Sequence, residues 1–336
     1  MIEIFGTLGP QCSEQKVLEA MFKEGMTGMR LNMSHAGLRE SAAIIRTYQA
    51  AARAAGVKAD LLIDMQGPEL RTGKTERDIV LNDGGSIQLK VDRPGHRRIS
   101  SIPVPIHVMN ALEPGDHILF DDGKLEVEVN DIKDQIATCH VIRGGVLTVK
   151  KSVKVVDKAI HGPALTKQDE ENIALAKDFG VTAIMQPFVQ SAQELQEVKA
   201  VLKANDAQDI RVFAKIESRE GMAHLEDILK ESDMIVIARG DLGNDMPLWE
   251  LPAAQKSIEK MCLHYHKPFL VVTQMLDSMV NRAVPTRAEV SDIFNAVEDG
   301  ANAVMVTNET AIGRYPIEVI KYLYQTCRVA EDYLKQ

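Results

Sequence analysis

Ionisable side chains of both signs stand near the ends of short apolar segments in this 336-residue chain. The cations are Arg30, Arg71 and Lys215, and the carboxylates are Asp64, Glu217 and Asp241. Guanidinium groups offer forked donors that suit a phosphoryl group, whereas carboxylate oxygens suit a hard cation such as Mg²⁺. Burying these charges together without a ligand would cost on the order of several kcal/mol for each. The set therefore predicts a site that binds a divalent cation and an anionic substrate.

The spacing around the lysine indicates what such a site could do. Lys215 lies two residues before Glu217, so both side chains project from one face of an extended segment. A lysine beside a metal-binding carboxylate can stabilise an oxyanion, which is the usual route to an enolate. Glu217 and Asp241 would then hold the divalent cation, Mg²⁺ or Mn²⁺.

Two further segments complete the predicted site. Arg239 and Gly240 precede Asp241 at the start of a predicted helix, where backbone N–H groups could hold a substrate carboxylate. Thr273 ends an apolar segment and could position a hydroxyl or a water molecule that carries a proton. Taken alone, each feature has an ordinary structural explanation, such as a surface ion pair or a helix cap. In combination they fit an acid that carries a phosphoryl group and forms an enolate.

Short apolar segments alternate with amphipathic helical stretches over most of the chain. The predicted strands are Ile2–Leu8, Gly28–Met33, Asp60–Met65, Thr182–Phe188, Arg211–Glu217, Met234–Ala238, Phe269–Thr273 and Ala303–Thr307. The predicted helices include Glu14–Lys23 with Ser13 as its cap, Arg39–Ala55, two that begin with capping boxes at Thr166 and Ser191, Thr286–Val297 and Pro316–Leu334. Eight such strands alternating with helices favour an α/β fold of the TIM (β/α)8 barrel type. The carboxyl ends of the strands would then bring the charged residues to one mouth.

The alternation breaks between about Gly73 and Ile160. Short strands follow one another there, separated by turn signals such as Asn82-Asp83-Gly84-Gly85 and Pro114-Gly115. We predict a small all-β domain, residues 73–160, inserted after the third strand of a barrel formed by residues 1–72 and 161–336. An insert on the loop face of a barrel would be a natural lid.

The charge balance argues against some partners. Lys and Arg number 39 and Asp and Glu number 48, so the formal net charge is −9. Phosphate affinity comes mainly from Lys and Arg, so neither nucleic acid nor an anionic membrane is an expected partner. The four cysteines lack CxxC spacing, and neither a signal-like start nor 18 consecutive apolar residues occurs. We therefore expect a cytoplasmic protein in a reducing compartment.

The motifs at the segment ends, taken in order, resemble those of the pyruvate kinase family. The matching segments are Arg30–His35, Gly67–Gly73, Lys215–Glu217, Ala238–Gly243, Thr273–Leu276, Pro285–Glu289 and Glu309–Thr310. The resemblance implies phosphoryl transfer between phosphoenolpyruvate and ADP, giving pyruvate and ATP through an enolate, with Mg²⁺ and K⁺ as cofactors. It also implies a homo-oligomer, a dimer or a tetramer.

The resemblance further implies roles for individual residues. Arg30 and Arg71 match phosphoryl-binding arginines, and Lys215 matches the lysine that stabilises the enolate. Thr273 matches the threonine near the carbon that gains a proton, and Glu217 and Asp241 match the Mg²⁺ carboxylates. The residues that match the K⁺ site are Asn32, Ser34, Asp64 and, through its carbonyl, Met65. The residues that match the nucleotide lining are Thr7, Pro10, His35 and Lys151.

Departures from the family pattern gather on the nucleotide side. Gln66 replaces a usual lysine, Ile312 stands where a lysine typically faces the nucleotide, and Glu40 stands where an aromatic residue often borders the adenine. These departures leave open a nucleotide-independent enolising enzyme, a lyase or decarboxylase that acts on pyruvate or oxaloacetate. A non-catalytic binding relative is a third hypothesis, because we expect the chain to lack the domain that follows the barrel in the family.

Overall fold

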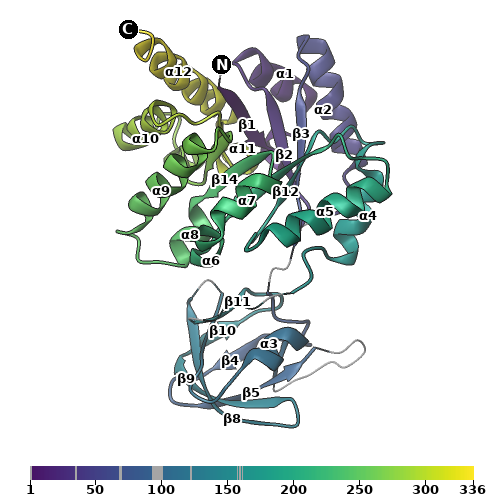
Figure 1. The fold of residues 1–336 in the computed structure, drawn as a ribbon, viewed down its shortest axis with the longest axis vertical. Helices are drawn as coiled ribbons and strands as arrows, with labels where there is room; N and C mark the ends of the chain where they lie inside the picture. The colour runs from purple at the N-terminus through teal and green to yellow at the C-terminus, as the bar shows by residue number, and fades with distance from the viewer. Residues whose placement is uncertain are drawn as a thin grey trace. The chain divides into compact units, whose positions relative to one another are not determined.

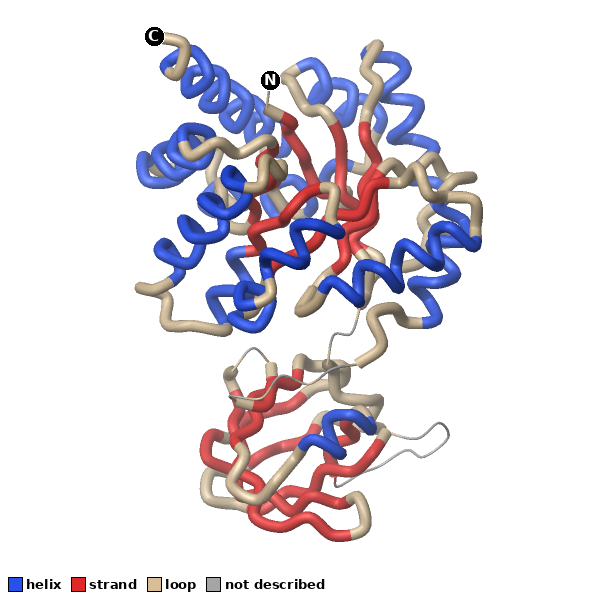
Figure 2. Tube along the Cα trace, in the orientation of Figure 1, coloured by secondary structure: helices blue, strands red, loops and turns tan. Residues whose placement is uncertain are grey.

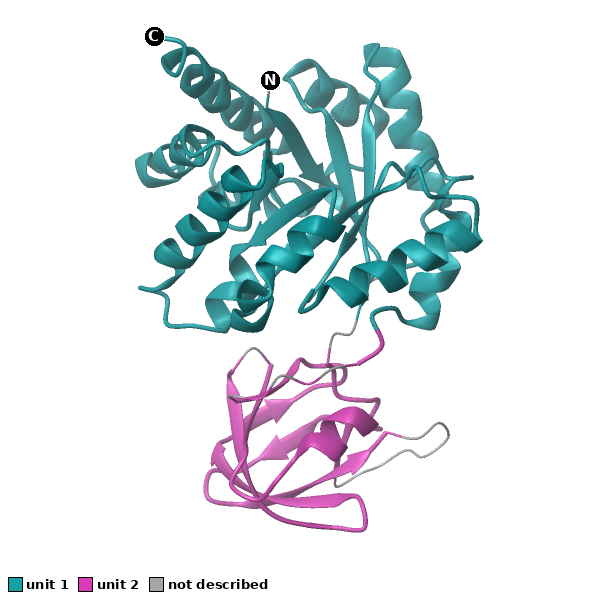
Figure 3. Ribbon diagram, in the orientation of Figure 1, with its two compact units in different colours: residues 1–67, 164–336 teal, residues 68–163 magenta. Residues whose placement is uncertain are grey.

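The computed structural model describes residues 2–34, 36–67, 70–92, 101–121, 123–156, 158, 160 and 162–336. They form two compact units, shown in different colours in Figure 3. The first unit comprises Met1–Gly67 and Ala164–Gln336, and the second comprises Pro68–Pro163. The divisions expected from the sequence, after residues 72 and 160, differ from these by a few residues at each crossing.

Eight parallel strands of the first unit close into a barrel (Figures 1 and 2). The strands are β1 (Glu3–Thr7), β2 (Gly28–Asn32), β3 (Asp60–Asp64), β12 (Ala183–Gln186), β13 (Arg211–Ile216), β14 (Met234–Ala238), β15 (Phe269–Val272) and β16 (Ala303–Met305). Their order around the barrel is β1-β16-β15-β14-β13-β12-β3-β2. All eight predicted strands are present, most of them slightly shorter than expected, so the TIM barrel prediction is confirmed.

Alternation along the strands sorts the apolar side chains into two layers. The inner layer consists of Phe5, Leu62, Ala183, Met185, Phe213, Met234, Val236, Ala238, Leu270, Val272, Ala303 and Met305. The outer layer, which includes Ile63 and Val212, packs against the helices. Side chains two residues apart on a strand share a face. Lys215 therefore follows Phe213 toward the interior, and Asp64 follows Leu62.

Helices cover the outside of the barrel, as Figure 2 shows. They are α1 (Gln15–Lys23), α2 (Ala42–Ala55), α4 (Lys167–Ala176), α5 (Ala192–Ala204), α6 (Arg219–Ala223), α7 (Leu225–Glu231), α8 (Arg239–Asn244), α9 (Leu251–His264), α10 (Arg287–Glu298), α11 (Asn308–Ala311) and α12 (Pro316–Tyr333), with short 3-10 helices η1 (Pro10–Cys12) and η2 (Asp277–Val280). The capping box predicted at Thr166 begins α4. The cap predicted at Ser13 is wrong, because its hydroxyl donates to the carbonyl of Pro10 and Glu14 precedes the helix instead. Among the described residues, no helix has both the length and the apolar character needed to cross a membrane.

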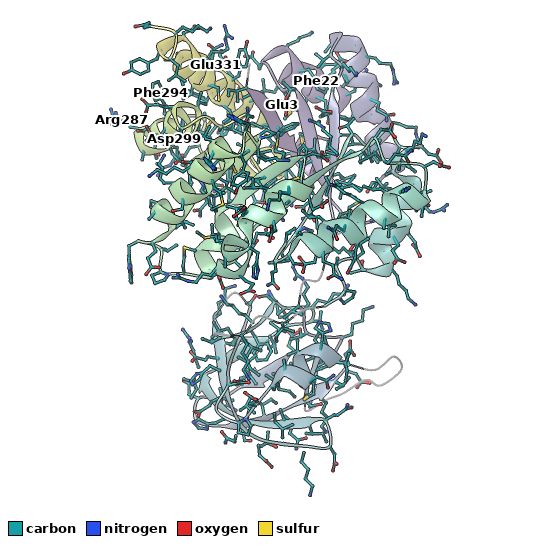
Figure 4. All side chains as sticks on the ribbon, in the orientation of Figure 1. Glu3, Phe22, Arg287, Phe294, Asp299 and Glu331 are labelled. Atoms are coloured by element: carbon teal, nitrogen blue, oxygen red, sulfur yellow. The ribbon has the colours of Figure 1, made fainter. Side chains whose placement is uncertain are left out.

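Both ends of the chain contribute to the closure of the barrel. Strand β1 pairs with β16, with Glu3 opposite Ala303. The N–H of Ile2 donates to Oε1 of Glu331 on α12 at 3.0 Å. Figure 4 labels Glu331 and, on β1, Glu3. The first and last segments of the first unit are therefore held side by side.

The second unit is β-rich and follows the third barrel strand, as expected. A six-stranded sheet has the order β11-β7-β8-β9-β5-β6, and β10 pairs with β4. These strands are β4 (Ile79–Leu81), β5 (Ser86–Val91), β6 (Ser101–Val104), β7 (His117–Phe120), β8 (Leu125–Lys133), β9 (Ile136–Arg143), β10 (Gly145–Leu147) and β11 (Val153–Val155). The unit also contains one short helix, α3 (Ile106–Ala111), which the sequence interpretation did not include. Pro105 precedes this helix, and Val108 and Met109 bury its apolar side.

Candidate active site

The carboxyl ends of four barrel strands carry most of the predicted site. Asp64 is the last residue of β3, Lys215 lies in β13, and Glu217 directly follows that strand. Asp241 lies in the first turn of α8, which follows β14, and Thr273 follows β15. Because parallel barrel strands all end at the same mouth, these residues gather there although they are far apart in the sequence.

An ion-pair network joins the partly buried Lys215 and Arg30 to buried carboxylates. The Nζ of Lys215 lies 3.0 Å from Oε1 of Glu217 and 3.3 Å from Oδ1 of Asp64. Arg30 reaches Oδ2 of Asp64 with Nε at 2.8 Å and Nη2 at 2.6 Å. Asp64 and Glu217 are both buried, so their charges depend on these partners. Asp64 thus fixes the positions of a guanidinium and an ammonium group at the mouth.

The surroundings shift the pKa values of three of these groups. Burial raises the pKa of Glu217 to about 7, which Lys215 opposes and the Asp241 carboxylate reinforces. Burial acts to lower the pKa of Lys215, but Asp64 and Glu217 together outweigh it and raise that pKa above its usual value. Burial likewise acts to raise the pKa of Asp64, but Lys215 and Arg30 hold it below its usual range. The lysine therefore stays charged at neutral pH, whereas Glu217 takes up and releases its proton near neutrality.

Glu217 keeps one oxygen suited to a metal ion. Its Oε2 accepts the N–H of Phe188 at 2.7 Å. Within the described part of the chain, its buried Oε1 accepts no hydrogen bond, although the Lys215 ammonium lies close to it. Asp241 is near enough to affect the pKa of Glu217. This carboxylate pair fits Mg²⁺ or Mn²⁺, which bind one or two protein carboxylates together with substrate oxygens and water.

No third acidic, histidine or cysteine ligand is available in the described residues, where no group of three such side chains forms a metal site. Hard cations of this kind also accept backbone carbonyl, amide, substrate and water oxygens as ligands.

Thr273 has an unusual backbone conformation. Its φ is +80° and that of Gln274 is +56°, a region that β-branched residues rarely adopt. The Nη2 of Arg239 donates to the Thr273 carbonyl at 2.6 Å, and its Nη1 pairs with Asp292 at 2.7 Å. A Cβ on Gly240 would lie 3.0 Å from Cγ2 of Thr273. Arg239, Gly240 and Thr273 thus lie together. Because the Arg239 guanidinium already binds the Thr273 carbonyl and Asp292, only the backbone N–H of Arg239 remains for the predicted contact with substrate.

The residues predicted to bind K⁺ lie at the ends of β2 and β3. The Oδ1 of Asn32 accepts the N–H of Ser34 at 3.0 Å. Asp64 takes part in the ion-pair network, and the N–H of Met65 donates to the carbonyl of Met185 at 3.0 Å. Asn32 and Ser34 are therefore in contact, while the carboxylate of Asp64 already pairs with Arg30 and Lys215.

The residues predicted to line the nucleotide are divided between the units. Thr7 is buried at the end of β1, where its hydroxyl donates to the Val306 carbonyl at 2.9 Å and lies 3.5 Å from Nη1 of Arg30. Pro10 is exposed at the start of η1. His35 lies outside the described residues.

Arg71 and Lys151 belong to the second unit. The Nη1 of Arg71 donates to the Lys150 carbonyl at 2.8 Å. The Nζ of Lys151 lies 2.7 Å from Oδ1 of Asp121. These contacts are internal to that unit, and the roles of both residues with phosphoryl group and nucleotide stay predictions.

Several residues that shape the mouth received no role in the sequence interpretation. The buried carboxylate of Glu309 accepts the N–H groups of Leu276 at 3.2 Å and Thr307 at 2.7 Å, so it joins the segments that follow β15 and β16. The hydroxyl of Thr310 accepts the N–H of Thr7 at 2.8 Å and donates to its carbonyl at 3.0 Å. The only indication in the sequence that Glu309 and Thr310 are important is that they belong to a motif of the family resemblance. Asp292 lies inside a predicted helix, and nothing in the sequence indicates its contact with Arg239.

The fold and the mouth together define a class of protein. A closed parallel (β/α)8 barrel carries partly buried cations paired with buried carboxylates at the carboxyl ends of its strands, which is where barrel enzymes place their chemistry. A family model described as the barrel domain of pyruvate kinase matches residues 1–320. The chain belongs to the pyruvate kinase family.

Individual relatives agree with this assignment. The chain is 36% identical to a pyruvate kinase of Geobacillus stearothermophilus, with 99% of this chain and 57% of that protein covered. It is 34% identical to a pyruvate kinase of Agrobacterium vitis, covering 98% and 68% of the two chains. A crystal structure of a pyruvate kinase from Cryptosporidium parvum matches with a TM-score of 0.90 and 30% identity, covering 98% and 69%. The chain thus spans between about half and two thirds of the length of these relatives.

Proposed function

We propose that the chain transfers a phosphoryl group between phosphoenolpyruvate and ADP, giving pyruvate and ATP. One observation carries the proposal: a charged, partly buried Lys215 lies between the carboxylates of Asp64 and Glu217, and Arg30 binds Oδ2 of Asp64. The relatives named above, all pyruvate kinases, support it. They do not favour the nucleotide-independent lyase or decarboxylase.

The side chains of this mouth suit the charges that the reaction would develop. Arg30 would donate to the phosphoryl oxygens, and Asp64 would hold its guanidinium in place. Lys215 would place its positive charge at the oxygen that becomes an enolate when the phosphoryl group departs. Both cations are fixed before substrate arrives, so little reorganisation opposes the chemical step.

The proposal includes two kinds of cation. Glu217 and Asp241 would hold Mg²⁺ or Mn²⁺, which supplies positive charge beside the substrate oxygens when it is bound. The proposed K⁺ ligands are Asn32, Ser34, Asp64 and the Met65 carbonyl. The backbone N–H groups of residues 239–241 would hold the substrate carboxylate, and the Thr273 hydroxyl would direct a proton to the enolate carbon.

The test is pyruvate formation from phosphoenolpyruvate and ADP with Mg²⁺ and K⁺, after dialysis of the protein against a chelator. We expect turnover that requires both ADP and the divalent ion. A protein that produces no pyruvate above a Lys215→Met control contradicts the proposal. Deuterium incorporation into the methyl group of pyruvate without any nucleotide would support the lyase or decarboxylase instead.

The raised pKa of Glu217 predicts a pH-dependent metal affinity. A carboxylate must lose its proton before it can bind a metal ion, and the pKa of Glu217 is about 7. We expect the affinity for Mn²⁺ to fall about tenfold for each pH unit below 7. Isothermal titration calorimetry at pH 5.5, 6.5 and 7.5 would measure it, with the exposed Glu226→Gln as a control that keeps the pH dependence. An affinity that changes less than twofold over this range contradicts the prediction.

We also propose that the protein is cytoplasmic and assembles with itself as a dimer or a tetramer. The four cysteines, Cys12, Cys139, Cys262 and Cys327, are free and buried, which supports a reducing compartment. Leu248 and Trp249 are adjacent and strongly exposed, at 72% and 83%, which supports a contact between copies. Light scattering at micromolar concentration tests the assembly, and a monomer mass contradicts it.

A further inference from the structure

Asp169 in the first turn of α4 makes contacts that reach well beyond its own helix. The residue is completely buried. Its carboxylate closes the capping box of α4 by accepting from the N–H and the hydroxyl of Thr166 at 2.9 and 2.8 Å. The same carboxylate accepts the N–H of Gln66 at 2.8 Å and the N–H of Gly67 at 3.0 Å. It therefore binds two segments that are about one hundred residues apart in the sequence.

The equivalent carboxylate of the next helix caps that helix without contacting a distant segment of the chain. Glu194 occupies the same position in the box that begins α5. It accepts the N–H groups of Gln190 at 2.7 Å and Ser191 at 3.1 Å, both within four residues of it. In addition to capping its helix, Asp169 accepts the N–H groups of Gln66 and Gly67, and we call this pair of contacts the tether.

The tether lies where the chain passes between the two compact units. Gly67 is the last residue of the first unit before the insert, and Ala164 is the first residue after it. Asp169 holds the outgoing segment, while the buried Gln186 at the end of β12 donates from Nε2 to the Ala164 carbonyl at 2.7 Å. Gly67 has φ +60°, and a Cβ there would lie 2.4 Å from Cγ of Pro187. Both crossings are thus fixed on the barrel side by buried side chains.

Gln66 extends the tether to the loop that follows β2. Its Nε2 donates to the Met33 carbonyl at 3.0 Å. Met33 precedes Ser34, whose N–H donates to Asn32, and the N–H of Met33 donates to the Asp64 carbonyl at 2.9 Å. Arg30 lies on the same strand as Asn32. The side chain of Gln66 therefore connects the tethered segment to a loop at the mouth.

We propose that Asp169 and Gln66 are positioning residues for the site at the barrel mouth. Asp169 fixes the segment that leaves β3, and Gln66 passes this constraint to the Met33–Ser34 loop, next to Arg30 and Asp64. The consequence for catalysis rests on the proposed function, since the phosphoryl group would bind at Arg30. The tether itself is a property of the fold and can be measured without turnover.

Amide hydrogen exchange in the full chain tests the tether. Asp169→Asn keeps one acceptor oxygen and points an NH₂ group at backbone N–H donors, so we expect Gln66 and Gly67 to exchange about tenfold faster or more. Glu194→Gln is the matched control, because it alters a capping carboxylate without touching residues 66 and 67. Exchange at Gln66 and Gly67 that stays at the wild-type rate in Asp169→Asn overturns the proposal, as does an equal acceleration in Glu194→Gln.

Gln66→Met provides a second and milder test. It preserves the side-chain volume and the backbone N–H but removes the donor to Met33, so we expect faster exchange at Ser34 and unchanged exchange at Gly67.

Steady-state kinetics tests the consequence for the site. The KM for phosphoenolpyruvate is expected to rise about tenfold in both Asp169→Asn and Gln66→Met with a smaller change in kcat. Partial unfolding would instead lower kcat and leave KM unchanged. Unchanged exchange at Ser34 or an unchanged KM overturns the role of Gln66. A wild-type protein without turnover would refute the proposed function, but the exchange rates would still show whether Asp169 and Gln66 hold these segments in place.

Discussion

Replacing Lys215 by Met is expected to lower the turnover of phosphoenolpyruvate by about 10²–10³-fold or more. Methionine fills much of the space of the lysine stem but carries no charge to the oxygen that becomes an enolate. Loss of a single fixed donor at such an oxygen costs about this factor in other enzymes. The coupled assay for pyruvate measures the effect, and kcat is expected to fall more than KM rises because the interaction develops in the transition state.

Lys199→Met is the matched control for this change. Lys199 also pairs with a glutamate, Glu231, at 3.1 Å, but it is 41% exposed and lies within α5 rather than at a strand end. Its removal is expected to leave turnover within about twofold, since exposed ion pairs contribute little. A Lys215→Met protein that retains more than a third of wild-type turnover would remove the lysine from the chemistry.

Replacing Asp64 by Asn is expected to lower the free energy of unfolding by about 3–5 kcal/mol. The substitution leaves the partly buried Lys215 with a single carboxylate and takes from Arg30 its partner at 2.6 Å. Asp227→Asn is a suitable control, because Asp227 pairs with Lys230 at 2.9 Å while 69% exposed, and its loss is expected to cost less than about 1 kcal/mol. Urea unfolding at pH 7 measures both, and equal midpoints for the two variants would show that Asp64 does not hold the network together.

The pH dependence of the Asp64 contribution has a definite sign. The folded-state pKa lies below the ordinary value of 3.8, because Lys215 and Arg30 outweigh burial. The stabilisation is therefore fully present above the ordinary pKa and is lost as the pH falls through the lower, folded-state value. The destabilisation caused by Asp64→Asn should therefore persist down to about pH 5, and the free energies of unfolding of the two proteins should converge only below about pH 4. If the two free energies of unfolding already became equal at pH 6, the stabilisation would come from a titrating group other than Asp64.

The fold could be predicted because its signals are local. Each barrel strand is a short apolar run bounded by polar or glycine residues, as in Met234–Ala238. Several of the helices between them have a start signal of their own, such as the capping boxes at Thr166, Ser191 and Thr286. Once eight such strands are recognised, the closure of the barrel brings Lys215, Glu217 and Asp64 to one mouth without further information. The direction of their side chains then follows from the inward-facing Phe213 and Leu62 two residues earlier.

The remaining contacts could not be predicted because they depend on distances that only the folded chain sets. The sequence marks Asp169 as a capping residue, and nothing in it shows that Gln66 would come within 2.8 Å of the same carboxylate. Arg239 stands before a helix whether its guanidinium faces a ligand or, as observed, the Thr273 carbonyl and Asp292. The limits of the insert were also displaced by a few residues, because the compact unit begins and ends where packing changes rather than where the strand pattern does.

The pairing of β1 with β16 has a consequence for biosynthesis. β1 leaves the ribosome before the other barrel strands, but one edge of β1 has no hydrogen-bonding neighbour until Ala303 and the two residues after it have emerged. A nascent chain of intermediate length therefore carries an open, curved sheet with two bare edges, and such edges readily recruit strands from other molecules. Growth of the polypeptide thus passes through a long interval of aggregation risk, which ends only when the last strand is inserted.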